Sequence, residues 1–97
     1  MKLQLEKFGK TLLSRELGSE AFKAFQPTLR ELSKDEVLEI DFSGVLTLSP
    51  SWADEFLIPL LRIYHERLKL NPSDNAAVKT TINFLEDVHR EKFFYTS

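Results

Sequence analysis

Two kinds of hydrophobic spacing alternate along this chain, and the alternation limits the folds that it can adopt. Apolar residues occupy every second position from Met1 to Leu5 and form dense short runs at Val37 to Phe42 and Leu68 to Leu70. A longer segment follows each of these, with apolar residues at steps of three and four. The first spacing is typical of strands and the second of amphipathic helices. Strands that alternate with helices predict right-handed crossovers, so we expect an α/β domain with a short, mainly parallel sheet and about three helices.

The first expected helix begins near Leu12. Gly18 weakens it by about 1 kcal/mol relative to alanine, and Pro27 is expected to kink or end it. Its predicted apolar stripe consists of Leu13, Leu17, Ala21, Ala24 or Phe25, Thr28 or Leu29, and Leu32.

The middle of the chain predicts a buried strand that leads into a second helix. The run Val37 to Phe42 is interrupted only by two acids, a density that indicates a central strand covered on both faces. Ser43 and Gly44 end this strand. Ser49 is a good N-cap and Pro50 suits the first helical position, so we expect the helix to start there, although Ser51 and Asp54 offer a second register. Its apolar stripe continues to Leu68 despite a bend expected at Pro59.

The last third of the chain predicts a strand, a turn and a third helix. Leu68 to Leu70 forms the strand, and Asn71 to Asp74 has turn and cap chemistry. The helix has apolar positions at Val78, Ile82, Leu85, and Val88 or His89. Phe93 to Ser97 is expected to be a short strand or a docked tail, in which three consecutive aromatic residues cannot all face one core.

Composition excludes several classes of protein. A length of 97 residues suits one domain, spanning 1–97, and the net charge of -2 has no basic stripe that would suit nucleic acid. Without cysteine there is no disulfide scaffold, thiolate metal site or thiol nucleophile. No apolar stretch approaches the roughly 20 residues of a membrane span, and the first residues have no signal-peptide pattern. We therefore expect a cytoplasmic protein.

No residue set predicts an enzyme, a cofactor or a metal ion. The three glycines form no phosphate-binding or nucleophile-elbow motif. His65 and His89 are expected to be solvated helix positions, and Asp54 and Glu55 to be first-turn acids stabilised by the helix dipole. A further hypothesis is that Arg15 pairs with Asp54, Glu55 or Asp41.

Two motifs in this chain resemble those of a known family. The segment Ile40 to Val45 reads IDFSGV, and Ser49 to Glu55 reads SPSWADE. Upstream, Gly9 to Gly18 contains a Ser-Arg-Glu helix opening. Together they resemble the STAS-like domains of unknown function over about residues 3–88. The resemblance implies kinship with anti-sigma-factor antagonists, which bind ATPases of the histidine-kinase-like fold.

In those antagonists a hydroxyl residue near the helix start is phosphorylated by the partner. When the family pattern is laid on this sequence from Asp41, the acceptor position falls on Pro50, which has no hydroxyl. Ser49 and Ser51 are the remaining candidates, and phosphate there would gain about 0.3–1 kcal/mol from the helix dipole. Both serines also suit plain helix capping.

The expected function is therefore a non-enzymatic module that binds a partner protein, such as a histidine-kinase-like ATPase, through the surface from Ser49 to Glu55. Trp52 is either an interface anchor or a core residue. One alternative is a small ligand-binding or enzymatic domain that uses the crevice at the carboxyl ends of the strands. Another is a structural homo-oligomer built on Phe93 to Tyr95.

Overall fold

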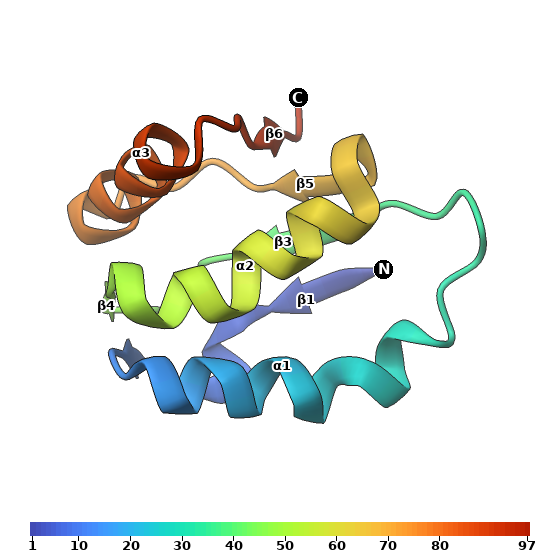
Figure 1. The fold of residues 1–97 in the computed structure, drawn as a ribbon, viewed down its shortest axis with the longest axis horizontal. Coiled ribbons are helices and arrows are strands. Elements are labelled where there is room, and N and C mark those ends of the chain that lie inside the picture. The colour runs from blue at the N-terminus through green and yellow to red at the C-terminus, as the bar shows by residue number, and fades with distance from the viewer.

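The computed structural model describes residues 1–97 and has the expected α/β architecture. Four parallel strands form the main sheet in the order β1-β3-β5-β6, and two short strands, β2 and β4, pair in parallel beside it (Figure 1). The strands are β1 (Lys2–Gln4), β2 (Thr11–Leu12), β3 (Leu38–Asp41), β4 (Thr47–Leu48), β5 (Leu68–Leu70) and β6 (Phe94–Tyr95). The helices are α1 (Arg15–Leu29), α2 (Pro50–Tyr64) and α3 (Ala76–His89), with short 3-10 turns η1 (Leu5–Phe8) and η2 (His65–Arg67).

The order of the strands in the sheet follows their order in the chain. Right-handed crossovers that always step in one direction place their helices on the same face of a sheet. Figure 1 shows α2 crossing in front of the strands, with α1 and α3 on either side of it. The termini of β3 and β5 that lead into α2 and α3 therefore meet at one end of the molecule.

The central strand is covered on one face only, which corrects the expectation of cover on both. Leu38 and Ile40 are fully buried, whereas Glu39 and Asp41 are half-buried on the opposite face. The register places Glu39 between Lys2 of β1 and Lys69 of β5. Opposite charges on neighbouring strands stabilise a sheet, so this row suits a face that meets water.

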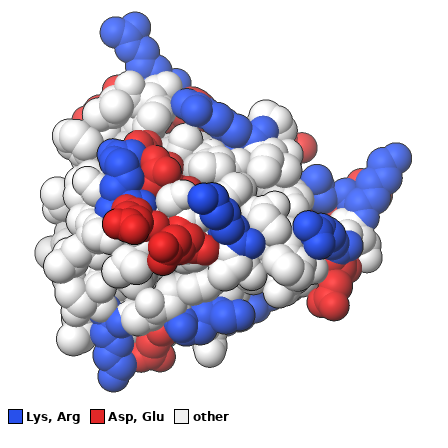
Figure 2. Space-filling model, turned by 60° about the horizontal axis from the view of Figure 1, so that its bottom comes forward, with Lys and Arg blue, Asp and Glu red and all other residues white.

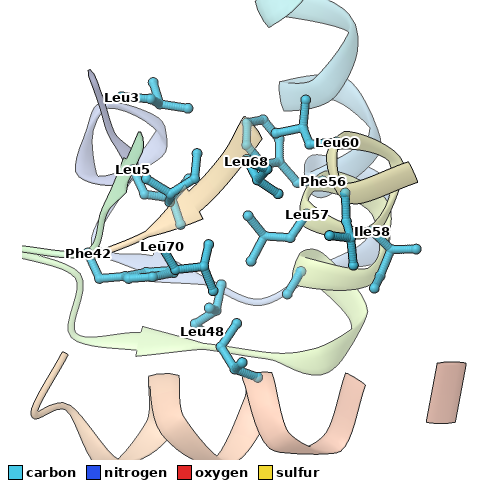
Figure 3. Close-up of a cluster of buried hydrophobic side chains, with 14 of the residues drawn as sticks. Leu3, Leu5, Phe42, Leu48, Phe56, Leu57, Ile58, Leu60, Leu68 and Leu70 are labelled. Carbon is cyan, nitrogen blue, oxygen red and sulfur yellow. The ribbon is translucent and has the colours of Figure 1, made fainter. Parts of the chain in front are cut away.

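Leucines and aromatic rings fill the space between the sheet and the helices (Figure 3). Trp52 and Phe56 of α2 stack with ring centroids 4.9 Å apart, and Phe8 and Phe25 pack against Phe56 at 5.2 and 6.1 Å. Burial of these rings fixes α2 between the sheet and α1.

The first helix is shifted from its predicted stripe. It begins at Arg15 after the N-cap Ser14, and its buried residues are Gly18, Ala21, Phe25 and Leu29. Leu13 precedes the helix, and the predicted core positions Leu13 and Leu17 are 51% and 58% exposed. Pro27 does not end the helix, which continues to Leu29.

The other elements agree with the sequence pattern. Ser49 caps α2 and Pro50 is its first residue, as predicted, whereas the cap of α3 is Asn75, one residue after the predicted turn. The C-terminal segment forms β6, with Phe93 buried and the next two aromatic residues exposed, as expected for three in a row. None of the helices combines the length and the apolar character needed to cross a bilayer.

Candidate functional site

Two serines at the start of α2 were candidates for phosphorylation, and the structure distinguishes them. The Ser49 hydroxyl accepts a hydrogen bond from the Trp52 amide at 3.1 Å and donates one to the Leu13 carbonyl at 2.5 Å. Pro50 has no hydroxyl. Ser51 is half-buried, and its side chain makes no hydrogen bond. Ser51 therefore carries the free hydroxyl of this helix start.

Trp52 is a core residue and not an interface anchor. Its side chain is 2% exposed and stacks on Phe56. Gly18 of α1 packs directly against the Trp52 backbone, where a Cβ atom would lie 2.5 Å from the Trp52 carbonyl oxygen. The tryptophan fixes where α1 crosses α2, and no partner can reach its ring.

Arg15 joins the two helices through ion pairs. Its Nη1 lies 2.9 Å from Asp54 Oδ2 and 2.7 Å from Glu55 Oε2, so one guanidinium bridges two adjacent carboxylates. Asp41, the third predicted partner, instead accepts a hydrogen bond from the Ser43 amide at 3.0 Å and lies 3.9 Å from Lys2. Because α2 starts at Pro50, both acids belong to its second turn and not to its first. Arg15, and not the helix dipole, is their main partner.

His89 at the end of α3 completes the arrangement, which corrects its expected place in solvent. Its Nε2 lies 2.5 Å from Asp54 Oδ1, and its Nδ1 lies 3.2 Å from Arg62 Nη2. A guanidinium can only donate, so Nδ1 accepts and the proton sits on Nε2, which donates to Asp54. The side chain is 20% exposed. The sequence feature that could have indicated this burial is the position of His89 on the apolar stripe of α3, four residues after Leu85.

These contacts form one continuous polar chain across α1, α2 and α3, which we call the charged seam, with His89 as its uncharged member between Asp54 and Arg62. Its members, in order, are Glu55, Arg15, Asp54, His89, Arg62 and Glu91. Burial by itself would raise the pKa of Asp54, but the hydrogen bonds from Arg15 and His89 outweigh it and hold that pKa below its ordinary value. The hydrogen bonds that Arg15 donates to Asp54 and Glu55 raise the pKa of its guanidinium. Figure 2 shows positive and negative side chains next to one another, with no field of one sign on that face.

A hollow of about 410 Å³ lies beside the charged seam, between the start of α2 and the end of α3. Ser51, Arg15 and Asp54 form its polar lining. The side chains of Phe84 and Val88 form its apolar wall. Phe84 and Val88 are 51% and 57% exposed. Apolar surface of this kind beside half-buried polar groups suits contact with another molecule.

His89 is not placed to activate Ser51 as a nucleophile. Both nitrogens of His89 are engaged by Asp54 and Arg62, and Ser51 is not hydrogen-bonded to the imidazole. A nucleophile needs a base within hydrogen-bond reach, and this arrangement holds the base elsewhere. No group of three or more ligating side chains could hold a metal ion. Comparisons with family models, with curated proteins and with solved structures give no match to this chain.

Proposed function

We propose that this chain is a STAS-like regulatory module that acts in the cytoplasm and docks on a partner protein without catalysing a reaction. The docking surface is the hollow beside the charged seam with its apolar wall, and the partner is an ATPase of the histidine-kinase-like fold. Ser51 is the residue through which phosphorylation regulates the contact.

The observation that carries this proposal is the gathering of exposed apolar side chains at the start of α2. Phe84 and Val88 share the hollow with Ser51. Leu13 and Leu17 do not line the hollow but flank Arg15 in the chain, and the Leu13 carbonyl accepts a hydrogen bond from the hydroxyl of the N-cap Ser49. Each of these four apolar residues is more than half exposed. Phe84 and Val88 lie one helical turn apart on α3, so they form one apolar patch that a partner can cover.

The charges of the surface favour a protein partner. The seam pairs acids with bases internally, so it offers no excess positive charge for phosphate backbones. An apolar centre with a polar rim of both signs is the usual anatomy of a protein–protein interface. The seam would then orient the partner, while the apolar wall would supply most of the affinity.

The STAS-like assignment is supported by the contact between its two motifs. The Ser-Arg-Glu opening of α1 supplies Arg15, and the SPSWADE segment supplies Asp54 and Glu55, which Arg15 binds. Two of the three stretches that carry the resemblance therefore form one structural unit. The α/β fold with a parallel sheet is of the class that the resemblance implies.

Phosphorylation of Ser51 would disturb this unit by a defined route. A phosphate carries a charge of about -1.5 to -2 and binds guanidinium strongly. Ser51 and Asp54 line the same hollow as Arg15, so the phosphate would repel Asp54 and compete with it for Arg15. We expect the modified protein to bind its partner more weakly.

The docking surface is tested by titrating the chain against a purified histidine-kinase-like ATPase from the same organism. Replacing both apolar wall residues, Phe84→Asp with Val88→Asp, should weaken binding by more than about tenfold, because contact residues at an interface centre cost more than 1 kcal/mol each. Ile63→Asp is the matched control, since Ile63 is 50% exposed at the far end of α2. Equal losses in the two variants, or no binding by the wild type, would contradict the proposal.

The phosphorylation site is tested by incubating the two proteins with ATP and locating the phosphate by mass spectrometry. Ser51 should be modified, and Ser51→Ala should remove the modification while Ser49→Ala keeps it. The mimic Ser51→Glu should reduce affinity for the ATPase relative to Ser51→Ala. Modification at Ser49, or none at all, would show that this part of the proposal is wrong.

A further inference from the structure

A separate cavity of about 170 Å³ opens at the carboxyl ends of β3 and β5, and it shares no residue with the hollow beside the charged seam. Its floor consists of four buried apolar side chains, Phe42, Leu70, Val78 and Ile82. Figure 3 shows Phe42 next to Leu70 at this end of the sheet. An engineered interior cavity of about 150 Å³ holds one benzene ring, which gives a scale for this open cavity. The space therefore suits a single ring or a branched aliphatic chain.

A polar hollow of about 330 Å³ borders this cavity. The two spaces share Phe42, Pro72 and Ser73, so they adjoin at these residues. The polar hollow is lined by the carboxylates of Asp41 and Asp74, with serine hydroxyls around them. Ligands of open parallel sheets commonly bind at this edge, outside the carboxyl ends of the strands.

The mouth carries one charge of each sign without an ion-pair partner. Lys79 lines the apolar cavity and forms no salt bridge, and Asp74 lines the polar hollow and forms none. Asp74 directly precedes the N-cap of α3, and Lys79 is the fourth residue of that helix. These two positions lie on the same side of a helix start, and the two charged groups are more than 4.0 Å apart because they form no ion pair. A small zwitterion can therefore contact both side chains at once.

We propose that this composite site binds a free α-amino acid with an apolar side chain of the size of leucine or phenylalanine. The side chain fills the cavity above Phe42 and Leu70, the α-carboxylate pairs with Lys79, and the α-ammonium pairs with Asp74. Asp41 accepts a hydrogen bond from the Ser43 amide and adds negative charge on the ammonium side. Burial of the apolar group supplies the affinity, and the two charges select a zwitterion over an amine or an acid.

The experiment is a titration of the labelled full chain, followed by amide NMR shifts, with phenylalanine and with two analogues that each lack one charge. Phenylalanine should shift the amides of Leu70, Ser73 and Val78 saturably. It should bind about tenfold more tightly than 2-phenylethylamine, which lacks the carboxylate, and than 3-phenylpropanoate, which lacks the ammonium. Equal affinity for either analogue, or shifts that do not saturate or lie elsewhere, would overturn the proposal.

Two surface variants sharpen the assignment of the charges. Lys79→Gln should bind phenylalanine no better than 2-phenylethylamine, and Asp74→Asn should bind it no better than 3-phenylpropanoate. Lys69→Gln, on the open face of the sheet over Phe94, is the control and should keep the wild-type preference. The Phe84→Asp, Val88→Asp variant should bind phenylalanine normally, which separates this site from the docking surface. Unchanged discrimination in both Lys79→Gln and Asp74→Asn would show that the charges play no part.

Discussion

The first two turns of α2 present two sides that hold the helix by different means. On one side, Trp52 and Phe56 are buried at 2% and 0% exposure among the rings of Phe8 and Phe25. On the other, Ser51 and Asp54 face a hollow and are half-buried. The apolar side fixes the position of the helix by shape, whereas the polar side links three helices by charge.

The two sides differ in how much stability they contribute. Burial of a large aromatic side chain is worth several kcal/mol, whereas partly exposed ion pairs contribute about 0–1 kcal/mol each. The charged seam can therefore change its partners at little cost to the fold. That freedom suits a surface proposed to bind and release another protein.

The largest effect is expected on the apolar side, for Trp52→Ala. The substitution removes the indole that stacks on Phe56 and leaves a cavity against α1, so the free energy of unfolding should fall by about 3–5 kcal/mol. Denaturant unfolding followed by circular dichroism measures the loss. Phe84→Ala, which truncates a half-exposed ring, is the control and should cost less than about 1 kcal/mol. Comparable losses would contradict the contrast drawn between the two sides.

Gly18→Ala probes the same side through the partner helix. In most helix interiors this change stabilises by about 1 kcal/mol, but here the new Cβ would lie 2.5 Å from the Trp52 carbonyl oxygen and 3.0 Å from its Cα. Backbone atoms cannot rotate away, so we expect a loss of about 1–3 kcal/mol in the free energy of unfolding.

Whether Gly18→Ala lowers or raises the melting temperature tests the close packing of α1 on α2, and thermal unfolding measures the change. Ser19→Ala, one position along α1, gives the ordinary helix-propensity gain and serves as the control. A stabilised Gly18→Ala protein would show that α1 and α2 do not meet as closely as the structure indicates.

The order of strands and helices could be predicted because each element carries local information. The alternation of Leu3 and Leu5, the cap at Ser49 and the proline after it act within a few residues. The buried side of α1 was predicted less accurately. Leu13 and Leu17 fit the spacing of its apolar residues, but Leu13 precedes the helix and Leu17 lies beside the surface that packs on α2. Only the packing on Trp52 shows that Gly18 lies on the buried side.

The candidate site was predicted in part for the same reason. The two motifs led to the hypothesis that Arg15 pairs with Asp54 or Glu55, and the structure confirms both contacts. The contact between His89 and Arg62 could not be predicted from the sequence, because it depends on how α3 packs against α2. The open face of the sheet was also missed, although Leu38 to Phe42 alternates apolar and acidic residues, which is the pattern of a strand covered on one face.

Ser49→Ala tests the boundary between the two sides. Its hydroxyl caps α2 and also binds the Leu13 carbonyl, so its loss should cost about 1 kcal/mol, within a range of about 0.5–2 kcal/mol. Ser51→Ala removes a hydroxyl without hydrogen bonds and should change the free energy of unfolding by less than about 0.5 kcal/mol. Urea unfolding of both variants gives the comparison. A larger loss in the free energy of unfolding for Ser51→Ala than for Ser49→Ala would contradict the assignment of Ser49 as the helix cap and of Ser51 as the free hydroxyl.

The smallest effect is expected in the charged seam, for Asp54→Asn in acid. Because the pKa of Asp54 in the folded chain lies below its ordinary value of 3.8, its stabilising contribution is present above that value and is lost as the pH falls through the folded pKa. Wild type should therefore lose more stability than Asp54→Asn between about pH 5 and about pH 2.5, by less than about 1 kcal/mol. Asp41→Asn, which removes a carboxylate stabilised mainly by the Ser43 amide, is the comparison variant for a site outside the seam. Parallel urea-unfolding curves for wild type and Asp54→Asn would mean that Arg15 and His89 hold α1 and α3 to α2 by geometry without any net electrostatic stabilisation.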